Sequence, residues 1–231
     1  METHICYIKR RHHLVRVQHP RSTDGHPRNE TTNSVYYIKY KKGIFYRADG
    51  TQIGDLTNLP IAHSKSDIIY NGRETHIRAW VWDIALEAKG NPVVVYTTHP
   101  KETEHHYHYA VHTDAGWQNH HVSPGGGWFP QTQEGKTERE PHYSGGVSIN
   151  HTDPSVVYLS RPVNGVFEIE RWQTSDAGQT WSSKAITQNS TDLNVRPVIP
   201  RRCPPSTDLV LWMYGTYIHY TNYQTQILIS K

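Results

Sequence analysis

The sequence predicts an all-β protein made of many short antiparallel strands. Its 231 residues include 15 Tyr and 7 Trp, which favour strands, and 16 Gly and 14 Pro, which interrupt them. Segments of strand length alternate with turn residues about every ten positions. No stretch keeps the apolar period of a helix. These observations favour a sandwich, a barrel or a propeller.

The expected strands follow one another from the first third of the chain to its end. Turn residues separate them, among them the hairpin-type pairs Asp49-Gly50 and Asn164-Gly165 and the pair Asp153-Pro154. In chain order the expected strands are residues 35–40, 43–46, 79–84, 92–98, 107–112, 118–122, 145–149, 156–160, 167–173, 195–199, 209–214 and 224–229.

A repeated turn motif favours the propeller. Residues 174–181 read Thr-Ser-Asp-Ala-Gly-Gln-Thr-Trp, the full Asp-box pattern, and residues 112–117 and 47–51 are shorter versions of it. Their glycines, Gly50, Gly116 and Gly178, lie 66 and 62 residues apart, which is the kind of period that repeat folds show. In such a turn the Asp carboxylate binds turn amides and the Trp covers the hairpin. The motif indicates the fold and does not indicate catalysis. The alternative for the two shorter versions is that they are unrelated Asp-Gly-type hairpins.

Beyond the turn motif, several segments of the chain carry a family resemblance. They are TDGHPRN (23–29), FYRADG (45–50), AWVWDIA (79–85), YSGG (143–146), VYLSR (157–161), NVRPV (194–198) and LWMYG (211–215). In this order they resemble the BNR-repeat family that contains the ulvan-lyase-type propellers. The resemblance covers most of residues 23–231, whereas residues 1–22 match poorly.

The resemblance implies a propeller of seven four-stranded antiparallel blades, of which this chain offers only a part. About fourteen expected strands make about three to four blades, similar to the C-terminal half of the family fold. An open arc leaves strand edges unpaired. We therefore expect a fragment, or one half of a ring that a second chain completes.

Charge and hydropathy exclude some classes of partner. The net charge is +3 and the basic residues form no long patch, so we expect no nucleic-acid binding. No segment is long and apolar enough for a membrane span, and the first residues lack the apolar run of a signal peptide. The family resemblance nevertheless implies a secreted protein that acts on a polysaccharide or oligosaccharide.

The resemblance implies a polysaccharide lyase that cleaves a uronate-containing glycan by β-elimination. That reaction needs a base, a cation beside the uronate carboxylate and an acid for the leaving oxygen, which His, Arg and Tyr supply without a cofactor. Tyr143 is the candidate acid or base, Arg161 the carboxylate neutraliser, and His26 or His99 the base. Further substrate-binding candidates are Arg196, Tyr217 and Trp128.

Two other functions remain open. A non-catalytic glycan-binding propeller would use the same aromatic loops, and a sialidase-type glycoside hydrolase would need an arginine cluster and a Tyr–Glu pair. Each candidate residue also has a structural alternative. Tyr143 could be a packing aromatic, Arg161 an ordinary ion-pair partner, and His26 and His99 solvated loop residues.

A structural zinc ion is a further expectation. His106 and His108 lie on one face of an expected strand, a spacing that suits two imidazole ligands, and His142 and Cys203 could complete the site. Zinc is what the family resemblance implies for such a site. The alternative is that both strand histidines are exposed polar residues.

Overall fold

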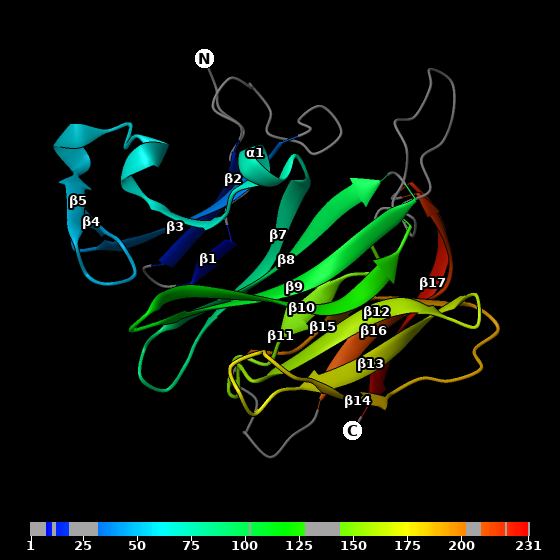
Figure 1. The fold of residues 1–231 in the computed structure, drawn as a ribbon. Helices are drawn as coiled ribbons and strands as arrows, with labels where there is room; N and C mark the ends of the chain where they lie inside the picture. Colours follow the sequence, from blue (N-terminus) through cyan, green and yellow to red (C-terminus); the bar gives the residue numbers. More distant parts are fainter. Residues whose placement is uncertain are drawn as a thin grey trace, which may run out of the picture. The chain divides into compact units, whose positions relative to one another are not determined.

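The computed structural model describes residues 8–10, 13–18, 32–101, 103–127, 144–201, 209–219 and 221–230. These residues form seventeen strands in four antiparallel sheets, drawn in Figure 1. The chain divides into two compact units, Met1–Thr98 with Tyr109–Asn119 and His99–His108 with His120–Lys231. The prediction of an all-β fold built from antiparallel sheets is confirmed. In the described part of the chain, no helix has the length and apolar character that crossing a membrane requires.

The first sheet belongs to the first unit and begins in the N-terminal segment. Its strands are β1 (Ile8–Arg10), β2 (His13–Gln18), β3 (Ser34–Lys41), β4 (Ile44–Tyr46), β5 (Gln52–Asp55) and β6 (Asp67–Tyr70). They run in the order β1-β2-β3-β4-β5, and β6 pairs with β3. Residues of the segment 1–22 are thus part of this sheet through the pairing of β2 with β3.

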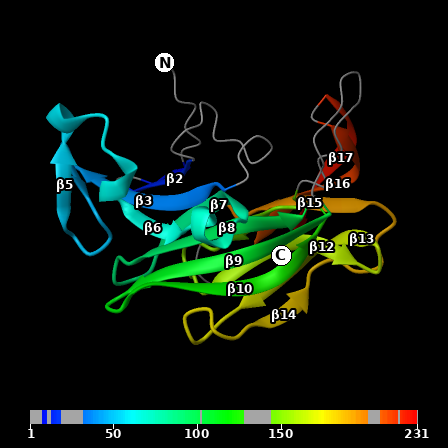
Figure 2. The same cartoon turned by 45° about the horizontal axis from the view of Figure 1, so that its top comes forward.

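The second sheet contains long strands in the order β10-β9-β8-β7 (Figure 2). They are β7 (Arg78–Leu86), β8 (Pro92–Lys101), β9 (Glu104–Thr113) and β10 (Gly116–Gly126), and the boundary between the units crosses the last three. In the first unit, apolar side chains of β3, β6, β7, β8 and β9 form one buried core that includes Tyr37, Val81 and Tyr96.

Two further sheets lie in the second unit. One has the order β11-β12-β13-β14, with β11 (Val147–Ile149), β12 (Val156–Val163), β13 (Val166–Gln173) and β14 (Ser182–Ala185). The other has the order β15-β16-β17, with β15 (Leu193–Val198), β16 (Val210–His219) and β17 (Asn222–Ser230). Both contribute to one core, in which Val156, Tyr158 and Ile169 contact Val210 and Trp212.

The full turn motif lies between β13 and β14 and is closed by its own side chains. The Asp176 carboxylate accepts hydrogen bonds from the Thr180 amide at 2.8 Å and from the Thr180 hydroxyl at 2.6 Å. The indole of Trp181 donates to the Gly178 carbonyl at 2.9 Å, and Gly178 has a φ of 98°. These bonds to Thr180 lower the pKa of Asp176 to about 2.

Each of the twelve expected strand segments overlaps a strand, but the structure contains more strands than the expected fourteen or so. Strands β1, β2, β5, β6 and β14 were not expected, and neither were the short helix α1 (Gly72–Thr75) and the 3-10 turns η1 (Leu56–Asn58) and η2 (His63–Lys65). Strand β14 is largely exposed, so its sequence has no apolar alternation to reveal it. Short polar edge strands are specified by their partners rather than by their own residues.

Strand β17 exposes an apolar face at the edge of its sheet. Among the described strands it pairs only with β16, and residues 222–230 contain no charged side chain. Tyr223, Ile227 and Ile229 are 57%, 64% and 53% exposed. An edge strand without charge or proline is a template for pairing with another chain.

We expect Ile227→Lys to reduce concentration-dependent association of the protein, because a lysine on the edge opposes strand addition. Light scattering across a concentration series measures the effect. Ile68→Lys is the control, since Ile68 is a similarly exposed isoleucine, 46% exposed, in β6. Equal scattering from the two variants would show that β17 does not mediate association.

Candidate functional site

The hydroxyl group of Tyr107 is a hydrogen-bonding hub in the second unit. Tyr107 lies in β9 and is fully buried, and its hydroxyl donates to the Ser160 carbonyl at 2.7 Å. The same oxygen accepts from the Gly146 amide at 3.0 Å and lies 3.3 Å from the Ser144 hydroxyl. Burial raises the pKa of Tyr107 to about 12, so the phenol stays protonated at neutral pH.

This hydroxyl is inserted into the ladder between β11 and β12. The Ser160 amide donates to the Gly146 carbonyl at 2.9 Å, as in a regular antiparallel pair. The return bond is replaced by a bridge, because the Gly146 amide donates to Tyr107 and Tyr107 donates to Ser160. Tyr107 therefore positions the chain on both sides of that pair.

The Gly145-Gly146 pair is required by this packing. A Cβ atom at Gly145 would lie 2.5 Å from the Ser160 hydroxyl oxygen and 2.7 Å from the Ser160 carbonyl oxygen, and Gly146 has a φ of 99°. In the structure the space at Gly145 is filled by β12.

Two histidines extend the hub from the ends of β8 and β9. The ring centroids of His99 and His105 are 5.9 Å apart, and the His105 ring meets Tyr107 edge-on at 5.2 Å. His99 is 2% exposed and His105 is fully buried. A Cβ atom at Gly125 would overlap Nε2 of His105, so glycine is required there as well.

Burial lowers the pKa of His105 from 6.5 to about 4. The nearby carbonyl groups of Gly126 and Gly127 offset part of this shift, and the charge of His106 adds to it. The His105 imidazole is therefore neutral at physiological pH.

The shifted pKa predicts that stability falls on acidification. Between the unfolded pKa of 6.5 and the folded pKa of about 4, the unfolded chain binds a proton that folded His105 does not. The contribution of His105 to the free energy of unfolding is therefore fully present above the unfolded pKa and falls as the pH decreases. The expected loss is about 2 kcal/mol from pH 7 to about pH 5 for this group. Chemical denaturation at both pH values measures it. His105→Gln should give a shallower pH dependence, and an unchanged dependence would contradict the assignment.

Arg196 reaches the hub from the first strand of the last sheet. Its amide donates to the Gly145 carbonyl at 2.6 Å, and its φ of 59° is unusual for a residue other than glycine. It lies where the register between β15 and β16 shifts. The positive charge of Arg196 acts to lower the pKa of Tyr107, so the guanidinium is within electrostatic reach of the phenol.

Arg161 is paired with a carboxylate on the neighbouring strand. Its Nε and its terminal nitrogen donate to Glu170 at 2.7 and 3.0 Å, and the guanidinium lies 5.9 Å from the Trp172 ring centroid. The Trp172 indole donates to the same carboxylate at 2.9 Å. Arg161 thus forms an ion pair, which is the structural alternative to its predicted role with substrate. Its role with substrate stays a prediction.

The hub brings together the neighbours of the predicted site residues. Ser144 follows Tyr143 in the chain, and Ser160 precedes Arg161. The Ser144 hydroxyl and the Ser160 carbonyl both contact the hydroxyl of Tyr107. The His105 ring lies between Tyr107 and His99 in this chain of ring contacts. The Arg196 amide is hydrogen-bonded to Gly145. Tyr143 itself, with His26 and Trp128, lies outside the described residues.

Tyr217 is not placed at the hub by any of these contacts. It is 9% exposed, and its ring stacks on Tyr223 of the adjacent strand at 6.1 Å. A packing role between β16 and β17 accounts for both observations. Its role in substrate binding stays a prediction.

The two strand histidines proposed as metal ligands both contact His121 of β10. His106 Nδ1 lies 3.0 Å from His121 Nε2, and His106 Nε2 lies 2.6 Å from a Glu104 carboxylate oxygen. The rings of His108 and His121 are 5.6 Å apart. Within the ranges that the structure describes, no three His, Cys, Asp or Glu side chains are arranged to hold a metal ion. His142 and Cys203 lie outside those ranges, so the four-ligand zinc site stays a prediction.

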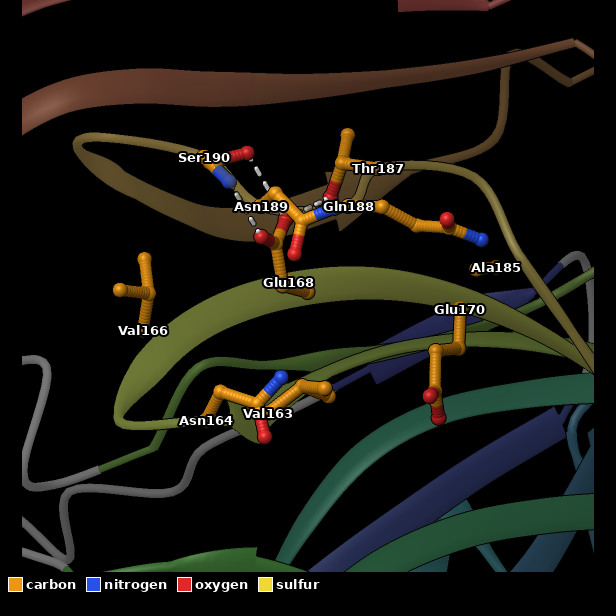
Figure 3. A pocket seen from close by; sticks show the side chains of 10 residues that line it. All are labelled: Val163, Asn164, Val166, Glu168, Glu170, Ala185, Thr187, Gln188, Asn189 and Ser190. Atoms are coloured by element: carbon orange, nitrogen blue, oxygen red, sulfur yellow. Dashed lines mark hydrogen bonds between the residues drawn. The ribbon is translucent and has the colours of Figure 1, made fainter.

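A pocket of about 380 Å³ opens beside the third sheet (Figure 3). Its wall includes Glu168 and Glu170 of β13, the hairpin around Asn164 and the loop that follows β14. Glu168 is 2% exposed, and its carboxylate points to the loop that carries Thr187 and Ser190, whereas Glu170 points away from that loop.

Comparison with known families identifies the chain. The family model described as BNR repeat-containing family member matches residues 2–124, more than half of the sequence. The chain belongs to the BNR-repeat family. The resemblance to that family inferred from the sequence is therefore confirmed, and the match includes most of the segment 1–22.

Among solved structures, the BNR-repeat chain is similar to a polysaccharide lyase, an ulvan lyase of family 25 bound to the glycan -[GlcA(1-4)Rha3S]-. The TM-score is 0.58 at 13% sequence identity, over 97% of this chain and 50% of that chain. This likeness shows the fold, which is that of a partial propeller, and the chain spans about half the length of the lyase. Among curated proteins, none matches the sequence.

Sequence reasoning missed His105 and Tyr107, the centre of the cluster. They lie on the face of β9 opposite His106 and His108, and the alternation of buried and half-buried residues along the strand separates the two faces. The signal was present in the period of two. It did not indicate which face is buried, because one face carries histidine and tyrosine and the other face also carries histidine.

Proposed function

We propose that this chain is part of a polysaccharide lyase that cleaves a uronate-containing glycan by β-elimination. The observation that carries the proposal is the hub at Tyr107, which gathers an imidazole, a guanidinium and the chain next to Tyr143 in one place. The family membership and the ulvan lyase of similar fold support the same reaction class.

In the proposed reaction His99 is the base that removes the proton from C5, beside the uronate carboxylate. The electron pair of that C–H bond forms the C4=C5 double bond as the bond from C4 to the glycosidic oxygen breaks. Tyr143 donates its phenolic proton to the departing oxygen. Proton and electron pair are thus accounted for with no cofactor.

In the proposed reaction, Arg196 as well as Arg161 neutralises the uronate carboxylate of the substrate. Arg161 already shares two hydrogen bonds with Glu170, and turning to a substrate would break that pair. Arg196 lies within electrostatic reach of Tyr107 at the same hub. We therefore infer that Arg196 is the first cation that the carboxylate meets.

Tyr107 acts as a positioning residue in this proposal. Its hydroxyl bonds to Ser160 and Gly146, so it is fully engaged in holding the segments that carry Arg161 and Tyr143. We propose that the working form contains further blades, from a second chain or from additional residues, since the similar lyase is about twice as long.

The proposal is tested by ultraviolet absorbance with a panel of uronate-containing polysaccharides. Elimination creates an unsaturated uronate that absorbs, whereas hydrolysis does not. Size-exclusion fractions of different assembly state are assayed separately, and we expect absorbance to rise in the largest assembled species. His99→Gln should abolish the rise, and His76→Gln, in an exposed position with a φ of 56°, should preserve it. A flat signal in every well-folded fraction would contradict the proposal.

A glycan-binding module without catalysis is the second candidate. The burial of His99, at 2% exposed, and of Tyr107, at 0%, favours it, because neither side chain reaches solvent in this conformation. Affinity electrophoresis in gels that contain the same polysaccharides separates the two functions. Retardation without absorbance would identify the binding module.

A further inference from the structure

The pocket beside β13 combines an apolar flank with amide side chains. Val163, Val166 and Ala185 supply the apolar contacts, and Asn164, Gln188 and Asn189 supply the amides. Its volume of about 380 Å³ is at the small end of ligand pockets, which suits one sugar ring.

The carboxylate of Glu168 is fixed in the pocket wall by hydrogen bonds. One oxygen, Oε2, accepts from Ser190 at 2.9 Å, from Asn194 at 3.1 Å and from Thr187 at 2.5 Å. Among the described residues the other oxygen, Oε1, accepts only from the Ser190 amide, at 2.7 Å. Each carboxylate oxygen has two lone pairs, so Oε1, with its one donor among the described residues, retains an acceptor site.

The charged side chains that line the pocket favour an uncharged ligand. Among the described residues that line it, none is a lysine or an arginine. The charge of Glu170 is matched by Arg161, which leaves the carboxylate of Glu168 held by neutral donors. Such a site repels an anionic sugar and accepts hydroxyl donors.

Asn164 and Asn189 share a backbone conformation. Their φ values are 52° and 53°, in the left-handed region, and each occupies an exposed turn at the rim of the pocket. Glycine adopts this conformation without strain, so both amides can be removed while the turns are kept.

We propose that this pocket binds an uncharged sugar unit of the glycan. The ring would lie with its C–H face against the apolar flank, while its hydroxyls donate to Glu168 Oε1 and exchange hydrogen bonds with the rim amides. The inference rests on the proposed function, and it adds a subsite that selects the neutral unit of a chain with charged and uncharged sugars.

The pocket is connected to the hub through Asn194. Its side-chain amide donates to Glu168 at 3.1 Å, and its carbonyl accepts from the Ser160 hydroxyl at 2.6 Å. The Ser160 carbonyl in turn accepts from Tyr107. The pocket wall and the candidate site therefore share one hydrogen-bonded framework within the second unit.

Methyl β-D-glucoside and methyl β-D-glucuronide are a matched pair of probes, because they differ mainly in the charged carboxylate. Nitrogen–proton correlation spectra record the amide shifts of residues 185–190 during titration with each. We expect saturable shifts with the glucoside and a dissociation constant at least about tenfold weaker for the glucuronide. Equal or tighter binding of the glucuronide, or no shift with the glucoside, would overturn the proposal.

The double variant Asn164→Gly/Asn189→Gly should weaken glucoside binding by about tenfold, since it removes two hydrogen-bonding side chains. The control is Lys42→Gly/Ala177→Gly, which changes two exposed turn residues with φ values of 50° and 59° outside the pocket. The control should bind as the wild type does, and an equal loss in both variants would overturn the proposal. These titrations measure binding and need no turnover. A failed absorbance assay would therefore contradict the proposed function without deciding whether the pocket binds the glucoside.

Discussion

Replacing Tyr107 with Phe should lower the free energy of unfolding by about 3 kcal/mol. The change leaves the ring in place and removes only the hydroxyl. The Ser160 carbonyl then loses its donor and the Gly146 amide loses one of its two acceptors, both inside the protein. A buried polar group without a partner costs about 1 to 3 kcal/mol, and the Ser160 carbonyl becomes such a group while the Gly146 amide keeps only Ser144 as its acceptor.

Denaturant unfolding of the two proteins measures this loss. Tyr223→Phe is the matched control, since Tyr223 is 57% exposed and its hydroxyl can bond to water. The control should change stability by less than about 0.5 kcal/mol. If both variants lose equally little, the hydroxyl of Tyr107 does not hold β11 and β12 together, and its place as the hub is wrong.

Replacing Gly145 with Ala should be similarly damaging, at about 3 kcal/mol, for a steric reason. The new Cβ would lie 2.5 Å from the Ser160 hydroxyl oxygen and 2.7 Å from both the Ser160 Cβ and its carbonyl oxygen. These atoms cannot easily move away, because β12 is paired on both sides with β11 and β13. The thermal and denaturant midpoints of the variant record the loss.

Gly165→Ala separates the steric effect from a backbone effect. Gly165 has a φ of 86° and no atom within 4 Å of an added Cβ, so its replacement costs only the strain of the left-handed region, about 1 kcal/mol. We expect Gly145→Ala to lose clearly more. The opposite order would mean that the segment before β11 can shift away from β12.

Local sequence patterns were sufficient to predict most of the sheets. Apolar alternation and Gly- or Asn-containing turns located the long strands β7 to β10, and the turn at Asn164-Gly165 joins β12 to β13 as expected. The short strands β5, β6 and β14 were missed, because their stability comes from pairing with a neighbour.

The candidate site was predictable only in part, because its contacts span long stretches of sequence. Tyr107 meets Ser144 and Ser160, which are 37 and 53 residues away, and no local pattern links them. The ion pair of Arg161 could have been predicted from the sequence. Register from the Asn164-Gly165 turn places Arg161 opposite Glu168, one diagonal step from Glu170.

The central claim is that the site at the Tyr107 hub performs β-elimination. Proton NMR of the products from a uronate-containing polysaccharide tests it most directly, because elimination creates a vinyl proton at each new non-reducing end. We predict that this signal appears with the assembled wild-type protein, grows with every bond cleaved and is absent with His99→Gln. New reducing ends without a vinyl signal would identify a hydrolase, and an intact polymer bound to a well-folded protein would identify a binding module; either result would contradict the claim.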